Sequence, residues 1–353
     1  MKRLSQPRLV TPLLLACVLF IQGCAPGFVL RAAYEQSKIL LGREKISKII
    51  ANPKETEETK EKLKLVLNAR DFAISLGLTP KGSFLSYSRV DKEALVWVVA
   101  GCKPTKFQLY TWWFPIVGSV PYKGYFDKTD AEKEEQRLQS KGYETFVRGA
   151  DALSTLGWFD DPVLTTLIRH EDDWIVNTVI HESVHSTVWI KNNVPFNESL
   201  ANFVGFQGAT EFYKKTGNKE KERIALKRLS IEKNLGSFIE KLYSELNELY
   251  ESSAPESIKA ELRHKIFKKS VGANKKILSK LKILTTLNNA EIMQLKFYLT
   301  AFGDFKKLYE ISGQSWSSFF ESIKAISNEI ENDSSLDPFE LLKNHISKVD
   351  NTH

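Results

Sequence analysis

The sequence is poor in cysteine, which rules out a disulfide framework as the source of its stability. Only three of its 353 residues are cysteines, and only Cys24 and Cys102 lie outside residues 1–23. No C-x-x-C pair is present, which argues against a thiol redox motif or a cysteine-rich metal site. Stability must therefore come from a packed core, and a chain of this length with 11% aromatic residues can form one.

The sequence also lacks a strong charge imbalance. Its formal charge is +7 at pH 7, and Lys2, Arg3 and Arg8 supply three of these positive charges from residues 1–23, which contain no acidic residue. So mild a charge gives no reason to expect nucleic acid as a partner. Neither an internal repeat nor a low-complexity linker interrupts the chain, so we expect a single domain over residues 24–353.

Residues 1–23 have the pattern of an export signal. Their positive start is followed by an apolar run at 13–21, which is too short for a comfortable transmembrane helix. The run leads into I-Q-G-C, which resembles the bacterial lipobox, so we expect Cys24 to be acylated and to anchor the chain in the cell envelope. Because Ala25 follows the cysteine, the expected location is the outer membrane, facing the periplasm. A plain secreted protein cut near Gly23 is the alternative.

The remaining sequence divides into three parts by its apolar spacing. Residues 24–80 are predicted to be helical, with a break at Asn52–Pro53. Residues 83–160 contain short β-branched and aromatic runs, typical of strands, and one surface helix at 128–141. Residues 162–349 have helical spacing almost throughout. The predicted fold class is therefore α+β: a mostly helical domain with a small β-sheet packed against it.

The third part contains the motif H-E-S-V-H at residues 181–185. Apolar residues recur at helical intervals over 175–188, so His181 and His185 should lie one turn apart on the same side of a helix. Two imidazoles at this spacing can bind one zinc ion, and Glu182 can take a proton from water at the metal, as in H-E-x-x-H zinc peptidases. A pair of ordinary helix histidines is the alternative. It is disfavoured because the chain has only six histidines and because unpaired polar groups on so apolar a helix are costly.

A third metal ligand is expected on the next helix. A histidine six residues after His185 would indicate the metzincin arrangement, but Lys191 stands there. The gluzincin arrangement places a glutamate on a following helix instead. After a turn at 192–195, Glu198 lies early in a helix predicted over 197–215. Glu198 is therefore the favoured third ligand.

Two other carboxylates compete with Glu198 for this role. Glu211 lies much farther along the same helix, and Glu171 precedes the histidine helix. Asn202, one helical turn beyond Glu198, is placed to orient a ligand by hydrogen bonding.

Four stretches together are more specific than H-E-x-x-H alone. They are P-Y-K-G-Y-F at 121–126, L-S-T-L-G-W-F-D-D-P at 153–162, H-E-S-V-H at 181–185 and F-N-E-S-L-A-N-F-V-G at 196–205. In this order they resemble a bacterial family of predicted zinc aminopeptidases, often lipoproteins, over nearly the whole chain after residue 23. The resemblance implies a zinc-peptidase-like fold, a Zn²⁺ cofactor and a peptide substrate. The residues it implies are His181, His185 and Glu198 as metal ligands and Glu182 as the catalyst. Leu153 and Trp113 depart from the tyrosine and the cysteine expected at their positions.

The sequence thus favours a zinc-dependent peptidase, while the direction of cleavage rests on the resemblance alone. An aminopeptidase needs an anion to hold the free amine of its substrate, and Asp160, Asp161, Glu171 and Asp172 are the candidates near the motif. The G-x-M-E-N motif of the large aminopeptidase family is absent. The alternative function is an envelope lipoprotein that binds peptide or cell-wall material and has a non-catalytic metal site. The glutamate beside the first histidine argues against it, since a structural zinc site needs no adjacent base.

Two weaker features lie outside the motif. Residues 154–157 are a candidate strand edge for binding the substrate backbone, with a structural turn as the alternative. Tyr298 is a candidate for stabilising the oxyanion, with an ordinary core tyrosine as the alternative.

Overall fold

The computed structural model describes residues 26–114, 118–150, 160–280 and 287–350. The predictions for the export signal, for Cys24 and for residues 154–157 fall outside these ranges. Within them, no helix is both long enough and apolar enough to cross a membrane.

Three helices and a short strand form the N-terminal part. The elements are α2 (Pro26–Leu41), β1 (Glu44–Lys45), α3 (Ile46–Ala51) and α4 (Glu57–Ser75). The Thr56 side chain caps α4 by accepting a hydrogen bond from the Thr59 backbone N–H at 3.2 Å. Helix α4 ends before Gly77, whose φ of +90° suits a residue without a side chain. Its apolar face packs against the histidine helix, and the two contribute to one buried core.

The strands of the described residues form three small sheets. Their bounds are β2 (Ser86–Ser88), β3 (Val96–Cys102), β4 (Trp112–Phe114), β5 (Gly118–Val120), β6 (Tyr122–Tyr125), β7 (Glu144–Ala150) and β8 (Val163–Leu164). The sheet orders are β1-β2-β8, β6-β3-β7 and β4-β5.

The sheet β6-β3-β7 has two chemically different faces. Helix α5 (Lys128–Ser140) packs on one of them, where Val99, Ala131 and Leu138 are fully buried. The other face carries the residues that alternate with Val99 along the strands. In the antiparallel register Ala100 pairs with both Tyr122 and Phe146, and Val98 pairs with Arg148. A tyrosine and an arginine therefore project from the face opposite α5.

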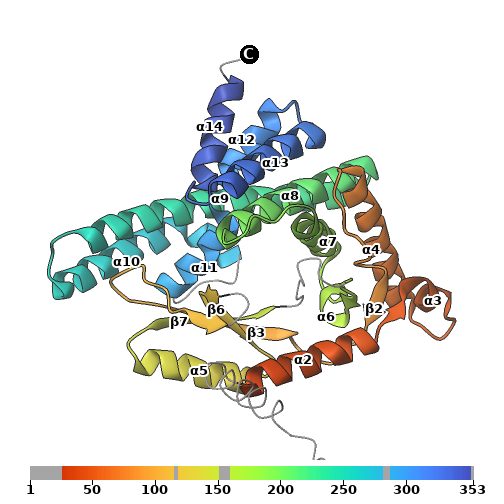
Figure 1. Ribbon diagram of the computed structural model, residues 1–353, viewed down its shortest axis with the longest axis horizontal. Helices are drawn as coiled ribbons and strands as arrows, with labels where there is room; N and C mark the ends of the chain where they lie inside the picture. The colour runs from red at the N-terminus through yellow and green to blue at the C-terminus, as the bar shows by residue number, and fades with distance from the viewer. Residues whose placement is uncertain (1–25, 115–117, 151–159, 281–286, 351–353) are drawn as a thin grey trace, which may run out of the picture.

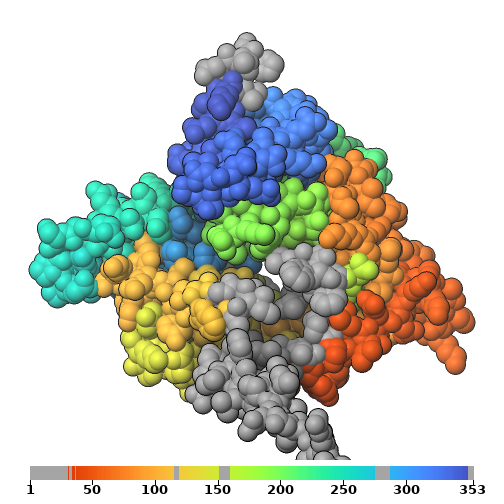
Figure 2. Space-filling model, viewed as in Figure 1, coloured from red at the N-terminus to blue at the C-terminus, as the bar shows by residue number. Residues whose placement is uncertain are grey.

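The remaining chain is almost entirely helical. The helices are α6 (Thr165–Ile168), α7 (Asp172–Thr187), α8 (Val194–Lys215), α9 (Lys219–Glu251), α10 (Glu256–Lys280), α11 (Asn289–Leu299), α12 (Phe302–Ile311), α13 (Trp316–Asn332) and α14 (Pro338–Asp350). In Figure 1, α12, α13 and α14 lie on one side of α8 and α9, and the sheet lies on the other side. Helix α11 contacts α8, α9, β3 and β7, so it joins the sheet to the helical body. Figure 2 shows α10 (cyan) extending to the left of the molecule and the C-terminal helices (blue) at its top.

Aromatic packing holds α8 against the C-terminal helices. Phe196 and Phe203 of α8 are fully buried, as are Phe305 of α12 and Phe319 of α13. The rings of Phe196 and Phe305 lie 5.3 Å apart, and those of Phe203 and Phe319 lie 5.7 Å apart. Buried ring pairs at such spacings stabilise the contact beyond the apolar area they bury. Helix α8 is therefore fixed on the side away from the sheet.

The structure confirms the predicted α+β class, a mostly helical fold with small sheets. Two details differ from the sequence expectation. The strands divide among three sheets, and the part expected to be helical after residue 162 begins with β8. Strand β8 pairs in parallel with β2, more than seventy residues earlier in the chain. A contact of such long range leaves no periodic pattern in either two- or three-residue strand.

Candidate metal centre

The two histidines project from the last turns of α7. Residues Ile175, Val176, Val179 and Ile180 of this helix are fully buried, which fixes its rotation about its own axis. The chain leaves the helix at Val188, whose backbone is extended. On this fixed helix His181 and His185 lie on one side, as their spacing predicts, with their rings 4.9 Å apart.

A tight turn brings α8 back beside α7. Asn192 adopts a left-handed conformation with φ of +61°. The buried side chain of Asn197 accepts a hydrogen bond from the Ile190 N–H at 2.9 Å and donates one to the Ile190 carbonyl at 2.8 Å. Because Pro195 is tolerated in a first helical turn, α8 begins at Val194, three residues earlier than predicted. The turn and these two Asn197–Ile190 hydrogen bonds place Glu198 opposite the histidines.

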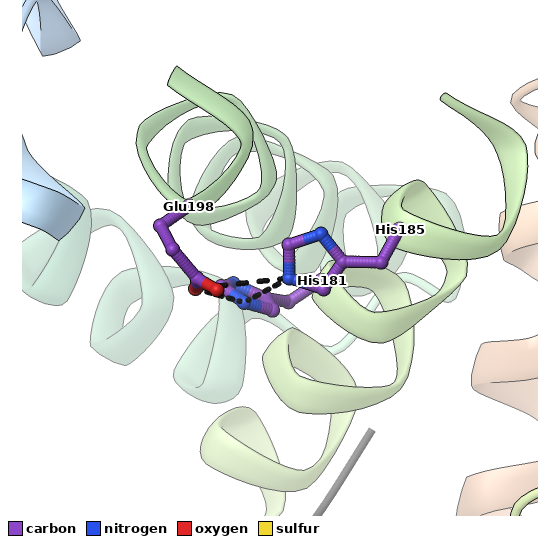
Figure 3. Close-up of side chains that lie close together, drawn as sticks. All are labelled: His181, His185 and Glu198. Carbon is purple, nitrogen blue, oxygen red and sulfur yellow. Dashed lines mark hydrogen bonds and ion pairs between the residues drawn. The ribbon is translucent and has the colours of Figure 1, made fainter. Parts of the chain in front are cut away.

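His181, His185 and Glu198 point toward one another, as Figure 3 shows. The Nε2 atoms of the two histidines are 3.2 Å apart. The Glu198 Oε2 atom lies 3.5 Å from Nε2 of His181 and 3.7 Å from Nε2 of His185. The His185 side chain is only 3% exposed, and the other two are 12% and 15% exposed. Three donor atoms thus converge on one small, largely buried space.

These separations suit a divalent ion. Ligand atoms bound tetrahedrally at about 2.0–2.1 Å from one ion lie roughly 3.3 Å from each other. The observed spacings of 3.2, 3.5 and 3.7 Å are close to that value. The three residues are also a group of ligand-type side chains that lie together within 4.8 Å. Two imidazoles and one carboxylate could therefore hold a metal ion and leave a coordination position open for a further ligand.

The electrostatics of the group favour the carboxylate in its charged form. Burial alone would raise the pKa of Glu198, but the contacts with His181 and His185 outweigh it and hold the pKa well below its usual range. Burial would lower the pKa of His185, yet the Glu198 carboxylate raises it above its usual value. The Glu198 carboxylate and the two imidazoles thus attract one another, and the carboxylate keeps its negative charge beside the histidines.

Glu182 lies beside this group without being part of it. Its Oε2 atom is buried and has no hydrogen-bond partner in the described part of the chain. Its charge contributes to raising the pKa of His185, after the larger effects of burial and of Glu198. A buried carboxylate oxygen without a partner is costly, so it indicates a group that meets water or a ligand in the working protein.

The structure brings together only some of the residues that the sequence nominated. Glu211 is engaged elsewhere: it accepts hydrogen bonds from Tyr309 at 2.9 Å and from Trp316 at 2.8 Å, and so joins α8 to α12 and α13. Glu171 is exposed at the other end of α7, about 15 Å from His181 by helix geometry. Of the three carboxylates considered, Glu198 is the one that joins the histidines.

The acidic residues suggested for holding a substrate amine do not belong to this group either. Asp172 forms ion pairs with Lys62, at 2.7 Å, and with Lys221. The Asp160 side chain accepts a hydrogen bond from the Gly82 N–H at 3.0 Å. The Asp161 N–H donates to the Ser83 hydroxyl, also at 3.0 Å. These contacts tie the start of α7 to α4 and α9, and they tie the segment before β8 to residues 82 and 83.

The suggestion that Asn202 orients a metal ligand is wrong. Its side-chain amide donates instead to the Tyr298 carbonyl at 2.9 Å, and Ser199 donates to the Phe297 carbonyl at 3.1 Å. The two bonds fasten the end of α11 to α8. Asn202 also contacts Glu232, whose pKa burial raises to about 7. Asn202 therefore positions Tyr298 through its backbone.

Tyr298 lies beside the three candidate ligands His181, His185 and Glu198, which we call the metal group. Two residues of the sheet, Arg148 and Tyr122, lie near it. Its ring is 6.5 Å from that of His181, and its hydroxyl accepts a hydrogen bond from Arg148 at 2.9 Å. Burial and then the Glu198 charge raise the pKa of Tyr298. The same two causes raise the pKa of Tyr122 to about 12, so the charge of Glu198 also acts on Tyr122.

Neither Arg148 nor Tyr122 is predicted as a site residue by a sequence pattern. Tyr122 lies in the P-Y-K-G-Y-F stretch that contributes to the family resemblance, but nothing in that stretch assigns it a role. Arg148 lies in an alternating strand pattern, where a polar residue is expected simply to face solvent.

Close packing at Gly205 sets the distance between α7 and α8. A Cβ atom at this position would lie 2.9 Å from Asn177 Nδ2 and 3.3 Å from His181 Cβ. Gly205→Ala should therefore lower the free energy of unfolding by about 1–3 kcal/mol through overpacking. It should also weaken metal binding, because His181 must move. Urea denaturation and metal titration measure the two effects.

Gly303→Ala is the matched control for this substitution. Gly303 is an exposed residue of α12, and a Cβ there would meet no atom within 4 Å. This change should be neutral or should stabilise the protein by up to about 1 kcal/mol. A Gly205→Ala protein with wild-type stability and metal affinity would show that the close approach does not position His181.

Comparison with known proteins identifies the family of the chain. The model of the family described as "Putative aminopeptidase" matches residues 27–335. The chain belongs to this family. The match extends from α2 to the end of α13 and includes both α7 and α8, and thus all three residues of the group. No curated protein and no solved structure shows significant similarity to the chain.

Proposed function

We propose that the protein is a zinc-dependent aminopeptidase, in which His181, His185 and Glu198 hold the metal and Glu182 is the general base. The observation that carries the proposal is the convergence of three ligand atoms beside Glu182, whose Oε2 atom is buried and has no hydrogen-bond partner among the described residues. Family membership supports the peptide substrate and the direction of cleavage. Two histidines and one glutamate, with a position left open, are a donor set characteristic of catalytic zinc.

Zinc in this site would polarise the scissile carbonyl and lower the pKa of water to roughly 7. Glu182 takes a proton from the attacking water, whose oxygen forms a bond to the carbonyl carbon. Glu182 then delivers that proton to the leaving amine as the C–N bond breaks, which returns Glu182 to its charged form. Tyr298, whose ring lies 6.5 Å from that of His181, would donate a hydrogen bond from its hydroxyl to the oxygen that gains charge.

The anchor belongs to the proposal as well. The I-Q-G-C sequence supports a lipid on Cys24, which would hold the enzyme at the bacterial envelope, facing the periplasm. Incorporation of a labelled fatty acid into the wild-type protein tests it, and a protein that takes up no label is not a lipoprotein.

The direction of cleavage has a direct test. Peptides with a free α-amine should be shortened from that end, whereas their N-acetylated copies should be poor substrates, by roughly 10-fold or more. The reason is that acetylation removes the charge by which an anionic group of the enzyme holds the first residue in place. Mass spectrometry of one peptide library in both forms measures the difference. Equal cleavage of both forms at internal bonds would identify an endopeptidase and contradict the proposed direction.

A further inference from the structure

Arg148 links the sheet to the metal group. It lies on the face of β7 opposite α5, and one guanidinium nitrogen donates to the Tyr298 hydroxyl at 2.9 Å. The guanidinium carbon is 5.4 Å from the centre of the Tyr298 ring, and that ring is 6.5 Å from the ring of His181. The guanidinium therefore lies at most about 12 Å from the ring of His181.

The positive charge of Arg148 has no counter-charge in the described part of the chain. Its hydrogen bond to Tyr298 is made to a neutral group and uses one of five N–H donors. Arg263, by contrast, binds both carboxylate oxygens of Glu144, on the same strand as Arg148, at 2.5 and 2.7 Å. Arg148 is half-buried. A partly buried charge without a partner is costly, which indicates that an anion binds there in the working protein.

The charge of Arg148 reaches the space around Glu198. Burial raises the pKa of Tyr122 to about 12, and Glu198 raises it while Arg148 lowers it. Two oppositely charged residues thus act on one tyrosine. A divalent ion held by His181, His185 and Glu198 would offset the charge of Glu198 and not that of Arg148.

We propose that Arg148 binds a carboxylate of the substrate, so that the enzyme prefers short peptides whose free C-terminus lies at this guanidinium. A planar guanidinium matches a carboxylate in two parallel hydrogen bonds. One or two extended residues span roughly 3–7 Å, which fits within the distance of at most about 12 Å between the guanidinium and the His181 ring. Dipeptides and tripeptides therefore place their C-terminal carboxylate within reach. This inference rests on the proposed peptidase function.

The kinetic test measures kcat/KM of the full-length protein for three peptides. They are a dipeptide or tripeptide as its free acid, the same peptide as its C-terminal amide, and an amide whose last residue is aspartate. For the wild type, amidation should lower kcat/KM by about 10- to 100-fold. If the terminal carboxylate alone is bound, as we propose, kcat/KM for the aspartate amide stays as low as for the plain amide. If kcat/KM for the aspartate amide equals that for the free acid, an acidic side chain can replace the terminal carboxylate, which contradicts the proposed C-terminal specificity.

Variants assign the preference to this residue. Arg148→Met should bring the ratio of acid to amide close to one, and Arg148→Lys should restore part of it, since lysine keeps the charge but not the planar fork. Arg223→Met removes an exposed arginine of α9 and should leave the ratio unchanged. A uniform loss of kcat/KM on all three substrates with Arg148→Met would overturn the assignment, because it would indicate that Arg148 acts only through Tyr298.

A binding measurement separates this inference from the proposed function. Isothermal titration with the reduced-bond dipeptide Ala-ψ[CH2NH]-Ala, as acid and as amide, requires no turnover. Tighter binding of the acid that Arg148→Met abolishes supports the carboxylate site even in a protein that cleaves no peptide. Equal binding of acid and amide overturns it even in an active peptidase. Circular dichroism of Arg148→Met establishes that the variant is folded.

Discussion

The Glu182→Gln protein should retain its metal and lose turnover by roughly 10²–10⁴-fold. Glutamine has nearly the same size and leaves His181, His185 and Glu198 in place, but it cannot accept the proton of the attacking water. Glu182 Oε2 has no other hydrogen-bond partner among the residues described, so the substitution removes no structural bond at that atom. Metal content and kcat of one preparation test both halves of the prediction.

Glu171→Gln provides the control on the same helix. Glu171 precedes the first turn of α7 and is exposed. The same chemical change there should leave both metal content and turnover unaffected. If Glu182→Gln hydrolysed peptides at the wild-type rate, Glu182 would not be the base and the assigned mechanism would be wrong.

The His185→Ala protein should lose both metal and activity. His185 contributes one of the three converging donor atoms, and the two remaining donors cannot replace it. Zinc affinity should fall by well over 100-fold, more than the loss typical of residues that merely support a ligand. Because a ligand stabilises the folded state that binds it, added zinc should raise the Tm of the wild type but not that of the variant.

The loss of a buried side chain could also destabilise this variant, so a second substitution is needed. Glu198→Gln preserves shape and should weaken zinc binding without leaving a cavity. His264→Ala removes an exposed histidine of α10 and should behave as the wild type. Zinc-dependent stabilisation that persists in both His185→Ala and Glu198→Gln would show that the metal binds somewhere else.

The helices of the candidate site were predictable from local sequence. The apolar spacing of α7 fixes which side of the helix carries His181 and His185, and the turn before Pro195 predicts a return of the chain. Sequence alone favoured Glu198 as the third ligand and left Glu211 and Glu171 as competitors. The two hydrogen bonds between Asn197 and Ile190 determine how α8 lies against α7. Such a contact depends on geometry and leaves no periodic pattern in the sequence.

The residues that the sheet and α11 contribute to the site could not be predicted from local sequence. Tyr122, Arg148 and Tyr298 come from β6, β7 and α11 and meet only because β3 pairs with both neighbouring strands while α11 packs across them. No local pattern encodes such an encounter. The sequence identifies Tyr298 as a candidate oxyanion donor only through its residue type. The structure shows that Arg148 donates a hydrogen bond to its hydroxyl.

The central claim is that this group of residues holds catalytic zinc, and metal analysis of the purified protein tests it most directly. We predict one zinc ion per chain, removed by a chelator together with activity, restored by added zinc, and absent from His185→Ala. A protein without stoichiometric zinc, whose activity does not rise when zinc is added, would contradict the account.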